Sequence, residues 1–223
     1  MIEVERQGDV SILRMVAGEN RINPTLLDSF TEALDGVEAG EGPTAVVLTG
    51  EGKFFSNGLD LEWMMANAEQ GGPGLVVNGL QALYARLVAF PAAVVAAVNG
   101  HAFAGGGMLA LACDQRVMRE DRGFFCLPEV DIDIPFSRGM SLLCQAKMTP
   151  GTAGEAMLTG RRYTAAEALA AGIVDATAPE DDVLPIAVER AAALAGKNRS
   201  TVGTIKRTMY APVVEALAEE ISF

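Results

Sequence analysis

The sequence predicts an α/β fold, in which helices pack on the faces of a sheet. Two short apolar segments, 44–49 and 93–98, have the length and composition of buried strands. Each is followed by a glycine-containing loop and then by a segment that looks helical. Most of the chain after residue 138 also has helical patterning. Strands and helices therefore alternate along the sequence, which favours the α/β class.

Turn and capping signals set the limits of the elements in the first half of the chain. Residues 2–6 and 10–15 alternate in polarity around Gly8-Asp9, which predicts a β-hairpin. Asn23-Pro24 is typical of a helix start, because an N-cap residue precedes a proline at the first helical position. The apolar residues that follow at helical spacing are Leu26, Leu27, Phe30, Leu34 and Val37. We then expect, in order, a strand at 44–49, a loop at 50–58, a helix at 60–65, a glycine-rich break at 71–74, a helix at 76–87, a strand at 93–98 and a helix at 108–113.

The second half is expected to be mainly helical. Two short strands are expected first, at 116–119 and 123–126. The expected helices are 138–147, 150–158, 164–171, 180–195 and 200–220, with one short strand at 173–176. No linker rich in proline and serine interrupts the long middle of the chain, and 50% of the residues are apolar. A single domain spanning 1–223 is therefore expected.

Charge and cysteine content argue against several classes of function. The formal net charge is −12, and nucleic acid or an anionic membrane surface requires clustered Lys and Arg, so neither is an expected partner. No apolar run reaches the ~18–20 residues that span a bilayer, and the alternating acidic start is unlike a signal peptide. The three cysteines, Cys113, Cys126 and Cys144, lie in apolar context, which indicates reduced thiols in a cytoplasmic protein. A catalytic thiol would need a histidine partner, and the sequence has one histidine, His101.

Two glycine-containing loops are the candidates for chemistry. The first, 53–61, leads from a strand into a helix that Asp60 can cap, and the first N–H groups of a helix have no partner within it. The second, 98–107, ends in three successive glycines but has neither dinucleotide nor P-loop spacing. Taken alone, each loop is better explained as an ordinary connection or as close packing of a helix on the sheet. Together they offer two N–H groups from separate strand ends, as a thioester oxyanion requires.

The motifs in these loops resemble those of the crotonase, or enoyl-CoA hydratase/isomerase, superfamily. The matching segments are Phe55-Ser56-x-Gly58-x-Asp60-Leu61, Asn99-Gly100-x-x-x-x-Gly105-Gly106-Gly107, Leu158-Thr159-Gly160, Ala165-x-Glu167-Ala168 and Gly172-Ile173-Val174. The resemblance implies a crotonase-like spiral of ββα repeats over about 1–180 and a helical C-terminal region over about 181–223. It also implies homotrimers or paired trimers.

A bent coenzyme A thioester is the ligand that the resemblance implies, with its adenine near the loop 56–61. By position, the oxyanion donors are the backbone N–H groups of Leu59 and Gly106. The residues expected to contact the acyl-CoA are Ser56, Asn57, Gly58, Asp60, Leu61 and Gly105. No cofactor is implied other than coenzyme A as part of the substrate. One histidine and scattered cysteines do not make a metal site.

Glu129 is the candidate acid–base group. Proton transfer beside a thioester enolate needs a carboxylate whose pKa is raised toward neutrality by an apolar site. Glu129 lies in the mostly apolar stretch 126–132, although a solvated turn after Pro128 explains the residues about equally well. The family's second catalytic glutamate falls on Glu129, which favours the catalytic role. The position of the family's first glutamate is occupied by Leu109.

A single carboxylate suits the movement of a double bond better than the addition of water, because an attacking water must be oriented and activated. The segments 54–60 and 128–135 look most like those of the Δ3,Δ2-enoyl-CoA isomerases. The resemblance thus implies an isomerase of fatty-acid β-oxidation that moves a 3-enoyl double bond to the 2-trans position. An enoyl-CoA hydratase, or another crotonase-type reaction, is the alternative. A non-catalytic acyl-CoA-binding protein is the second alternative.

A few other residues have both a functional and a structural interpretation. Trp63 and Leu109 can line an acyl pocket or belong to the core. Lys206 can contact a coenzyme A phosphate or lie on a solvated basic face. His101 is expected to be a hydrogen-bonded structural residue, and Asp114 a structural one. Asp131 and Asp133 are expected to be capping or solvated groups.

Overall fold

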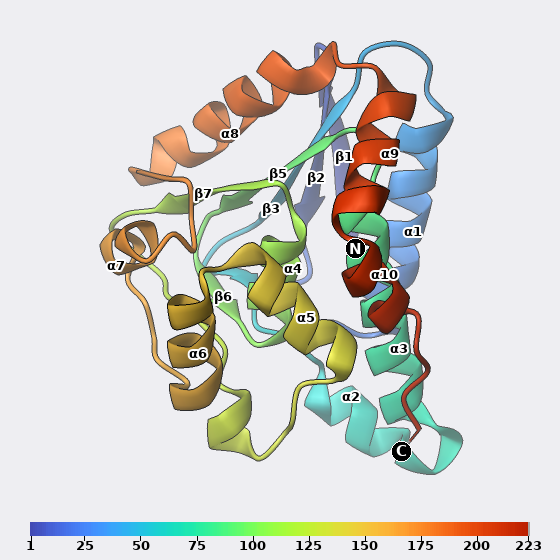
Figure 1. Ribbon diagram of the computed structural model, residues 1–223, viewed down its shortest axis with the longest axis vertical. Helices are drawn as coiled ribbons and strands as arrows, with labels where there is room; N and C mark the ends of the chain where they lie inside the picture. The colour runs from blue at the N-terminus through green and yellow to red at the C-terminus, as the bar shows by residue number, and fades with distance from the viewer. Residues whose placement is uncertain (223) are drawn as a thin grey trace.

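Two sheets form the centre of the computed structural model, which describes residues 1–222 (Figure 1). The larger sheet contains, in spatial order, β1 (Ile2–Gln7), β2 (Val10–Met15), β3 (Ala45–Gly50), β5 (Ala93–Val98), β7 (Gln115–Arg119) and β9 (Ala176–Ala178). The smaller sheet contains β4 (Phe54–Ser56), β6 (His101–Phe103) and β8 (Phe125–Cys126). The predicted hairpin is confirmed, because β1 and β2 pair antiparallel with Ile2 opposite Met15. The other strand pairs are parallel.

Helices connect the strands and make up the C-terminal part of the chain. They are α1 (Pro24–Ala39), α2 (Leu61–Ala66), α3 (Gly72–Val88), α4 (Gly105–Ala112), α5 (Arg138–Lys147), α6 (Pro150–Thr159), α7 (Ala165–Ala170), α8 (Glu180–Ala195), α9 (Arg199–Met209) and α10 (Ala211–Leu217). Two 3₁₀ helices are η1 (Ala68–Gln70) and η2 (Glu129–Ile132). The predicted start of α1 is confirmed, since the Asn23 side chain accepts a hydrogen bond from the Leu26 N–H at 3.1 Å and Pro24 opens the helix.

Each turn of the chain adds one strand to each sheet. β3 leads into β4, β5 into β6 and β7 into β8, and a helical segment follows each pair. This repetition confirms the predicted spiral of ββα repeats. Because β4, β6 and β8 run parallel as neighbours, the segments that follow them begin at the same edge of the small sheet. Those segments are α2, α4 and η2, and they surround the candidate site.

The larger sheet is buried on both faces. Helix α8 covers one face, where it packs on alternate residues such as Val47 and Val95. The other face, with Val46 and Val94, belongs to the main core together with α1, α3 and α4. Burial on both faces explains the continuous apolar runs of β3 and β5. Within the predicted helical C-terminal region, α8 covers the sheet, whereas α10 packs on α3 and α5.

The structure corrects several of the predicted limits. The helix expected at 200–220 is two helices, because Pro212 in the first turn of α10 cannot donate the N–H that a continuous helix needs. The expected break at 71–74 is limited to Gly71, whose φ is +76°. Pro73 lies in the first turn of α3, where a missing N–H has no cost. The strand expected at 173–176 is β9, a few residues later in the chain.

Glycine-rich and very short segments account for the other differences. Gly105, Gly106 and Gly107 form the first turn of α4 instead of preceding it. The loop expected at 50–58 contains β4, and β6 was not expected. The three cysteines are free and buried, as predicted. In the part of the chain that the structure describes, no helix is both long enough and apolar enough to cross a bilayer.

Candidate active site

The two glycine-containing loops lie directly against each other. A Cβ atom on Gly106 would lie 2.3 Å from the Ser56 carbonyl oxygen, so β4 packs on the backbone of α4 with no room for a side chain. A Cβ atom on Gly58 would lie 2.9 Å from the Ala104 Cβ, and the φ of Gly58 is +81°, a value that favours glycine. Both glycines are therefore needed for the approach of one loop to the other.

Several backbone N–H groups in these loops have no hydrogen-bond acceptor among residues 1–222, and two of them belong to the predicted oxyanion donors. One belongs to Leu59, which lies between two bonds to Ile22: the Ile22 N–H donates to the Gly58 carbonyl at 2.7 Å, and the Asp60 N–H donates to the Ile22 carbonyl at 2.9 Å. The other belongs to Gly106, in the first turn of α4, where N–H groups have no intrahelical partner and carry the positive end of the helix dipole. The site thus offers two donors held in fixed backbone.

Ala104 has a strained backbone conformation at the start of α4. Its φ is +49° and its ψ is −124°, a region that an L-residue rarely occupies and that costs of order 1–3 kcal/mol. The Ala104 N–H donates to the Cys126 carbonyl at 3.0 Å, so β8 holds this bend from the other side. The bend turns the chain from β6 into α4 and directs the first turn of that helix at the cavity described next.

A cavity of about 600 Å³ opens beside the two loops. Its walls come from the first loop, α2, α3, α4, the segment 128–137 and the chain after α10. They are largely apolar; the lining residues include Leu59, Met64, Leu80, Gly105, Met108, Phe136, Met140 and Ile221. No Lys, Arg or His side chain lines it among the described residues.

The tail after α10 completes one wall of this cavity. The Asn78 side chain on α3 donates to the Ile221 carbonyl at 3.1 Å and accepts from the Ile221 N–H at 2.9 Å. Gln81, one turn along α3, donates to the Glu219 carbonyl at 3.2 Å. Two amide side chains of α3 thus fix the backbone of this tail.

Some of the residues expected to contact the acyl-CoA line the cavity, and others make hydrogen bonds that hold the first loop in place. Asn57 and Leu61 line the cavity, as does Gly105 of the second loop. Ser56 is buried and donates to the Asn20 carbonyl at 2.7 Å, so it holds the loop in place. Asp60 caps α2 by accepting the Trp63 N–H at 3.1 Å, as predicted.

Both residues that were expected to line an acyl pocket lie one position from residues that do. The cavity is lined by Met64 and Met108 and not by Trp63 and Leu109. Neighbouring residues on a helix point about 100° apart, so a one-residue offset changes the surface that a side chain reaches. Leu109 is fully buried in the main core, so this position contributes no carboxylate to the cavity wall.

Glu129 is the buried carboxylate of the cavity. Its side chain is 6% exposed, and its Oε2 atom has no hydrogen-bond partner among the residues that the structure describes. Burial in this apolar wall raises the pKa of Glu129 from 4.5 to about 7, because no cation offsets the cost of ionising it. A carboxyl group with this pKa exchanges protons readily at neutral pH.

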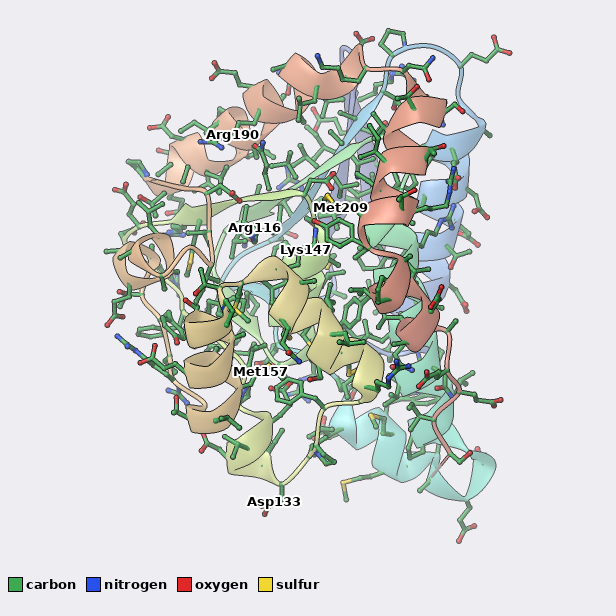
Figure 2. The ribbon with its side chains drawn as sticks, viewed as in Figure 1. Arg116, Asp133, Lys147, Met157, Arg190 and Met209 are labelled. Atoms are coloured by element: carbon green, nitrogen blue, oxygen red, sulfur yellow. The ribbon has the colours of Figure 1, made fainter. Side chains whose placement is uncertain are left out.

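The aspartates near Glu129 do not share its surroundings. Glu129 begins the 3₁₀ helix η2, and Asp131 and Asp133 are exposed, in line with their predicted solvated role. Figure 2 shows Asp133 at the outer edge of the molecule. Asp133 contributes to the rim of the cavity, so Glu129 is the only buried acidic residue among its described lining residues.

Lys206 does not lie where either interpretation placed it. Its ammonium group is buried, donates to the Ala92 carbonyl at 2.7 Å and forms an ion pair with Asp114 at 2.5 Å. Asp114 also accepts the Val94 N–H at 2.8 Å, which confirms its structural role. Lys206 thus ties α9 to the sheet and is neither a solvated group nor a candidate phosphate ligand.

The sequence did not point to a cationic cluster around His101. We use this name for Lys53, Arg122 and Arg162, whose charges all lower the pKa of His101, after the larger effect of its burial. Arg162 lies 5.7 Å from the ring of Phe103, a residue that lines the cavity.

His101 packs between aromatic rings, and its ring centre lies 4.8 Å from that of Phe103. Its buried Nδ1 has no hydrogen-bond partner in the described part of the chain, so the prediction of a hydrogen-bonded histidine is wrong.

Comparisons with known proteins identify the family and the fold of this chain. A family model described as enoyl-CoA hydratase/isomerase matches residues 7–223. Enoyl-CoA delta isomerase 3 of Arabidopsis thaliana is 35% identical over 223 residues, which cover 94% of this chain and 92% of the relative. The 2,3-dehydroadipyl-CoA hydratase of Escherichia coli is 32% identical over 194 residues, covering 86% and 74%. The crystal structure of human mitochondrial delta3-delta2-enoyl-CoA isomerase, 26% identical, superimposes with a TM-score of 0.89 over 97% of this chain and 85% of the other.

Proposed function

The chain belongs to the enoyl-CoA hydratase/isomerase family, and from this premise we propose that it is a Δ3,Δ2-enoyl-CoA isomerase. The observation that carries the proposal is the single buried carboxyl of Glu129, which has a pKa of about 7 and faces the same cavity as Leu59 and Gly105. One such group can both remove a proton and return it.

The proposed reaction is a proton shuttle within the bound thioester. The Glu129 carboxylate takes a proton from C2, and the C2–H electron pair moves into the conjugated system, so that negative charge develops on the thioester oxygen. The N–H groups of Leu59 and Gly106 stabilise this charge. The protonated Glu129 then returns the proton at C4, the double bond comes to lie between C2 and C3, and the enzyme regains its starting state.

The absence of a second buried acidic group along the described cavity wall favours isomerisation over hydration. Addition of water needs one group to activate the water and another to protonate the adjacent carbon, whereas the shuttle needs one group. The wall also lacks a cation among its described residues, so we propose a hydrocarbon acyl chain without a terminal charge. Assembly into trimers or paired trimers stays a prediction, to be tested by the mass in solution.

We expect the protein to isomerise a 3-enoyl-CoA at least about 100-fold faster than it hydrates the 2-trans-enoyl-CoA of the same chain length. Both rates can be followed by the absorbance of the conjugated enoyl thioester, which appears in isomerisation and disappears in hydration. Equal rates would instead support a hydratase. Tight binding of acyl-CoA without exchange of the C2 protons for solvent deuterium would support a non-catalytic acyl-CoA-binding protein.

We propose that the cationic cluster contacts the phosphates of coenzyme A. One member, Arg162, lies beside Phe103 at the cavity, and in a chain of net charge −12 a local group of three cations favours the binding of an anion. Arg162→Glu is expected to raise the dissociation constant for acyl-CoA about tenfold or more, because a charge-assisted contact becomes a repulsion.

The binding of an acyl-pantetheine, which lacks these phosphates, should be unchanged in the same variant. Lys197→Glu makes an equal change of charge at an exposed position after α8. It is the matched control, and titration calorimetry measures all three proteins. Equal weakening by both variants would mean that net charge alone, and not this cluster, governs binding.

A further inference from the structure

Tyr84 connects α3 to the peptide unit that carries the Gly106 N–H, one of the two predicted oxyanion donors. Its ring and hydroxyl are fully buried, and the hydroxyl donates a hydrogen bond to the Gly105 carbonyl at 2.6 Å. This carbonyl and the Gly106 N–H belong to the same peptide bond. No motif in the sequence points to a role for Tyr84.

The geometry of the peptide bond links the two groups. The C=O and N–H of a trans peptide lie in one plane and point in opposite directions. An anchor on the Gly105 carbonyl therefore fixes the direction of the Gly106 N–H. The anchor matters here because glycines flank this bond on both sides, and glycine backbone can rotate with little steric cost.

The hydrogen bond also affects the strength of the donor. A carbonyl that accepts a hydrogen bond polarises its peptide and makes the N–H on the other end a better donor. Burial, and secondarily the charge of Glu129, raises the pKa of Tyr84 well above its ordinary value. The hydroxyl thus keeps its proton throughout the pH range in which Glu129 titrates.

We propose that Tyr84 is a positioning residue of the oxyanion hole, which holds the Gly105–Gly106 peptide so that the Gly106 N–H faces the thioester oxygen. This inference rests on the proposed function, because it assumes that the cavity binds a thioester. The simpler explanation is that a buried tyrosine merely satisfies its hydroxyl with the nearest carbonyl. The two explanations differ in how strongly the carbonyl of a bound thioester is polarised.

Tyr84→Phe separates them, because it removes one oxygen atom and keeps the ring that fills the core. We expect kcat for 3-enoyl-CoA to fall about tenfold, which is part of the 10²–10³-fold effect of losing a whole oxyanion donor, while KM stays within about twofold. The second readout is the infrared C=O stretch of a bound, saturated acyl-CoA labelled with ¹³C at the carbonyl. In Tyr84→Phe this stretch is expected at a higher wavenumber than in the wild type, since the carbonyl is less polarised.

Tyr163→Phe is the matched control. The Tyr163 ring is buried, and its hydroxyl donates to the Glu155 carboxylate at 2.7 Å, on α6 and outside the described wall of the cavity. This variant should lose thermal stability to a similar extent but leave the carbonyl stretch and kcat unchanged. Replacement of Tyr84 by 3-fluorotyrosine, whose more acidic hydroxyl is a stronger donor, should move the stretch to a lower wavenumber than in the wild type.

The outcomes for Tyr84 and for the proposed function can be told apart. If the wild type isomerises 3-enoyl-CoA but Tyr84→Phe retains its kcat and its carbonyl stretch, the inference about Tyr84 is wrong and the proposed function stands. If the wild type polarises a bound thioester but catalyses no isomerisation, the proposed function fails, and the shift in Tyr84→Phe still decides the role of Tyr84. If the wild type does not shift the carbonyl stretch on binding, there is no oxyanion hole for Tyr84 to position.

Discussion

Glu129→Gln is expected to lower kcat/KM for a 3-enoyl-CoA by about 10²–10⁴-fold, the usual contribution of a general acid–base group. Glutamine has nearly the same shape but cannot carry the proton from C2 to C4, so acyl-CoA binding should change little. Absorbance of the conjugated product measures the rate, and titration calorimetry measures binding. Glu189→Gln, at an exposed carboxyl on α8, is the matched control. Full activity in Glu129→Gln would assign the proton transfer to another group.

The pH dependence of the wild type provides an independent check on Glu129. The reaction starts from the carboxylate, whose pKa is raised to about 7 by burial. The value of kcat/KM should therefore fall about tenfold per pH unit well below pH 7 and level off above it. An inflection close to pH 4.5 would mean that the catalytic carboxyl is not desolvated in the free enzyme.

The same pKa predicts that the native glutamate destabilises the fold at alkaline pH. The carboxyl ionises near pH 4.5 in the unfolded chain and near pH 7 in the folded chain. No penalty exists below pH 4.5, where both forms are protonated. The penalty grows between these values and is complete above pH 7. The difference of the two pKa values corresponds to roughly 3 kcal/mol. Glu129→Gln should therefore unfold about 6–10 °C higher than the wild type at pH 8, with little difference at pH 4.

Gly106→Ala is expected to lower both activity and stability. The added Cβ would lie 2.3 Å from the Ser56 carbonyl oxygen and 2.7 Å from the Ser56 Cβ, so β4 or α4 must move. Overpacking of this kind costs typically about 1–3 kcal/mol. Displacement of the Gly106 N–H removes an oxyanion donor, which costs about 10²–10³-fold in kcat. Thermal unfolding and the isomerase assay measure the two effects.

Gly154→Ala is the matched control, since Gly154 lies in the middle of α6 and a Cβ there has no neighbour within 4 Å. This variant should be stabilised by about 0.5–1 kcal/mol, because alanine restricts the unfolded chain and favours helix. Its activity should equal that of the wild type. If Gly106→Ala folds normally and retains wild-type kcat, the second oxyanion donor is not the Gly106 N–H.

Local chemistry made much of the fold predictable. Asn23 with Pro24, and Asp60, are capping signals that act through neighbouring atoms, and the structure confirms both helix starts. The runs 44–49 and 93–98 identified buried strands because burial on both faces demands apolar residues throughout. The strands of the small sheet have only two or three residues. These strands form because they pair with one another, and a local sequence pattern does not predict such pairing.

The site was less predictable because its side chains depend on how elements pack. Glu129 lies in an apolar stretch, but the sequence alone is equally consistent with a solvated turn, and only the burial of the Glu129 side chain decides between them. Met64 and Met108 line the cavity in place of their neighbours because packing sets the rotation of a helix. The sequence does not show that Lys206 is buried, because its ion-pair partner Asp114 lies far away in the chain. The cationic cluster joins residues from three distant segments, which the spiral brings together.

The contact between Asn78 and Ile221 sets an order of events during synthesis of the chain. The two residues are 143 positions apart in sequence, and Ile221 forms part of the cavity wall. During translation the spiral, the two glycine-containing loops and Glu129 all emerge from the ribosome before this wall can close. The wall at Ile221 can therefore form only after the candidate catalytic residues have been made.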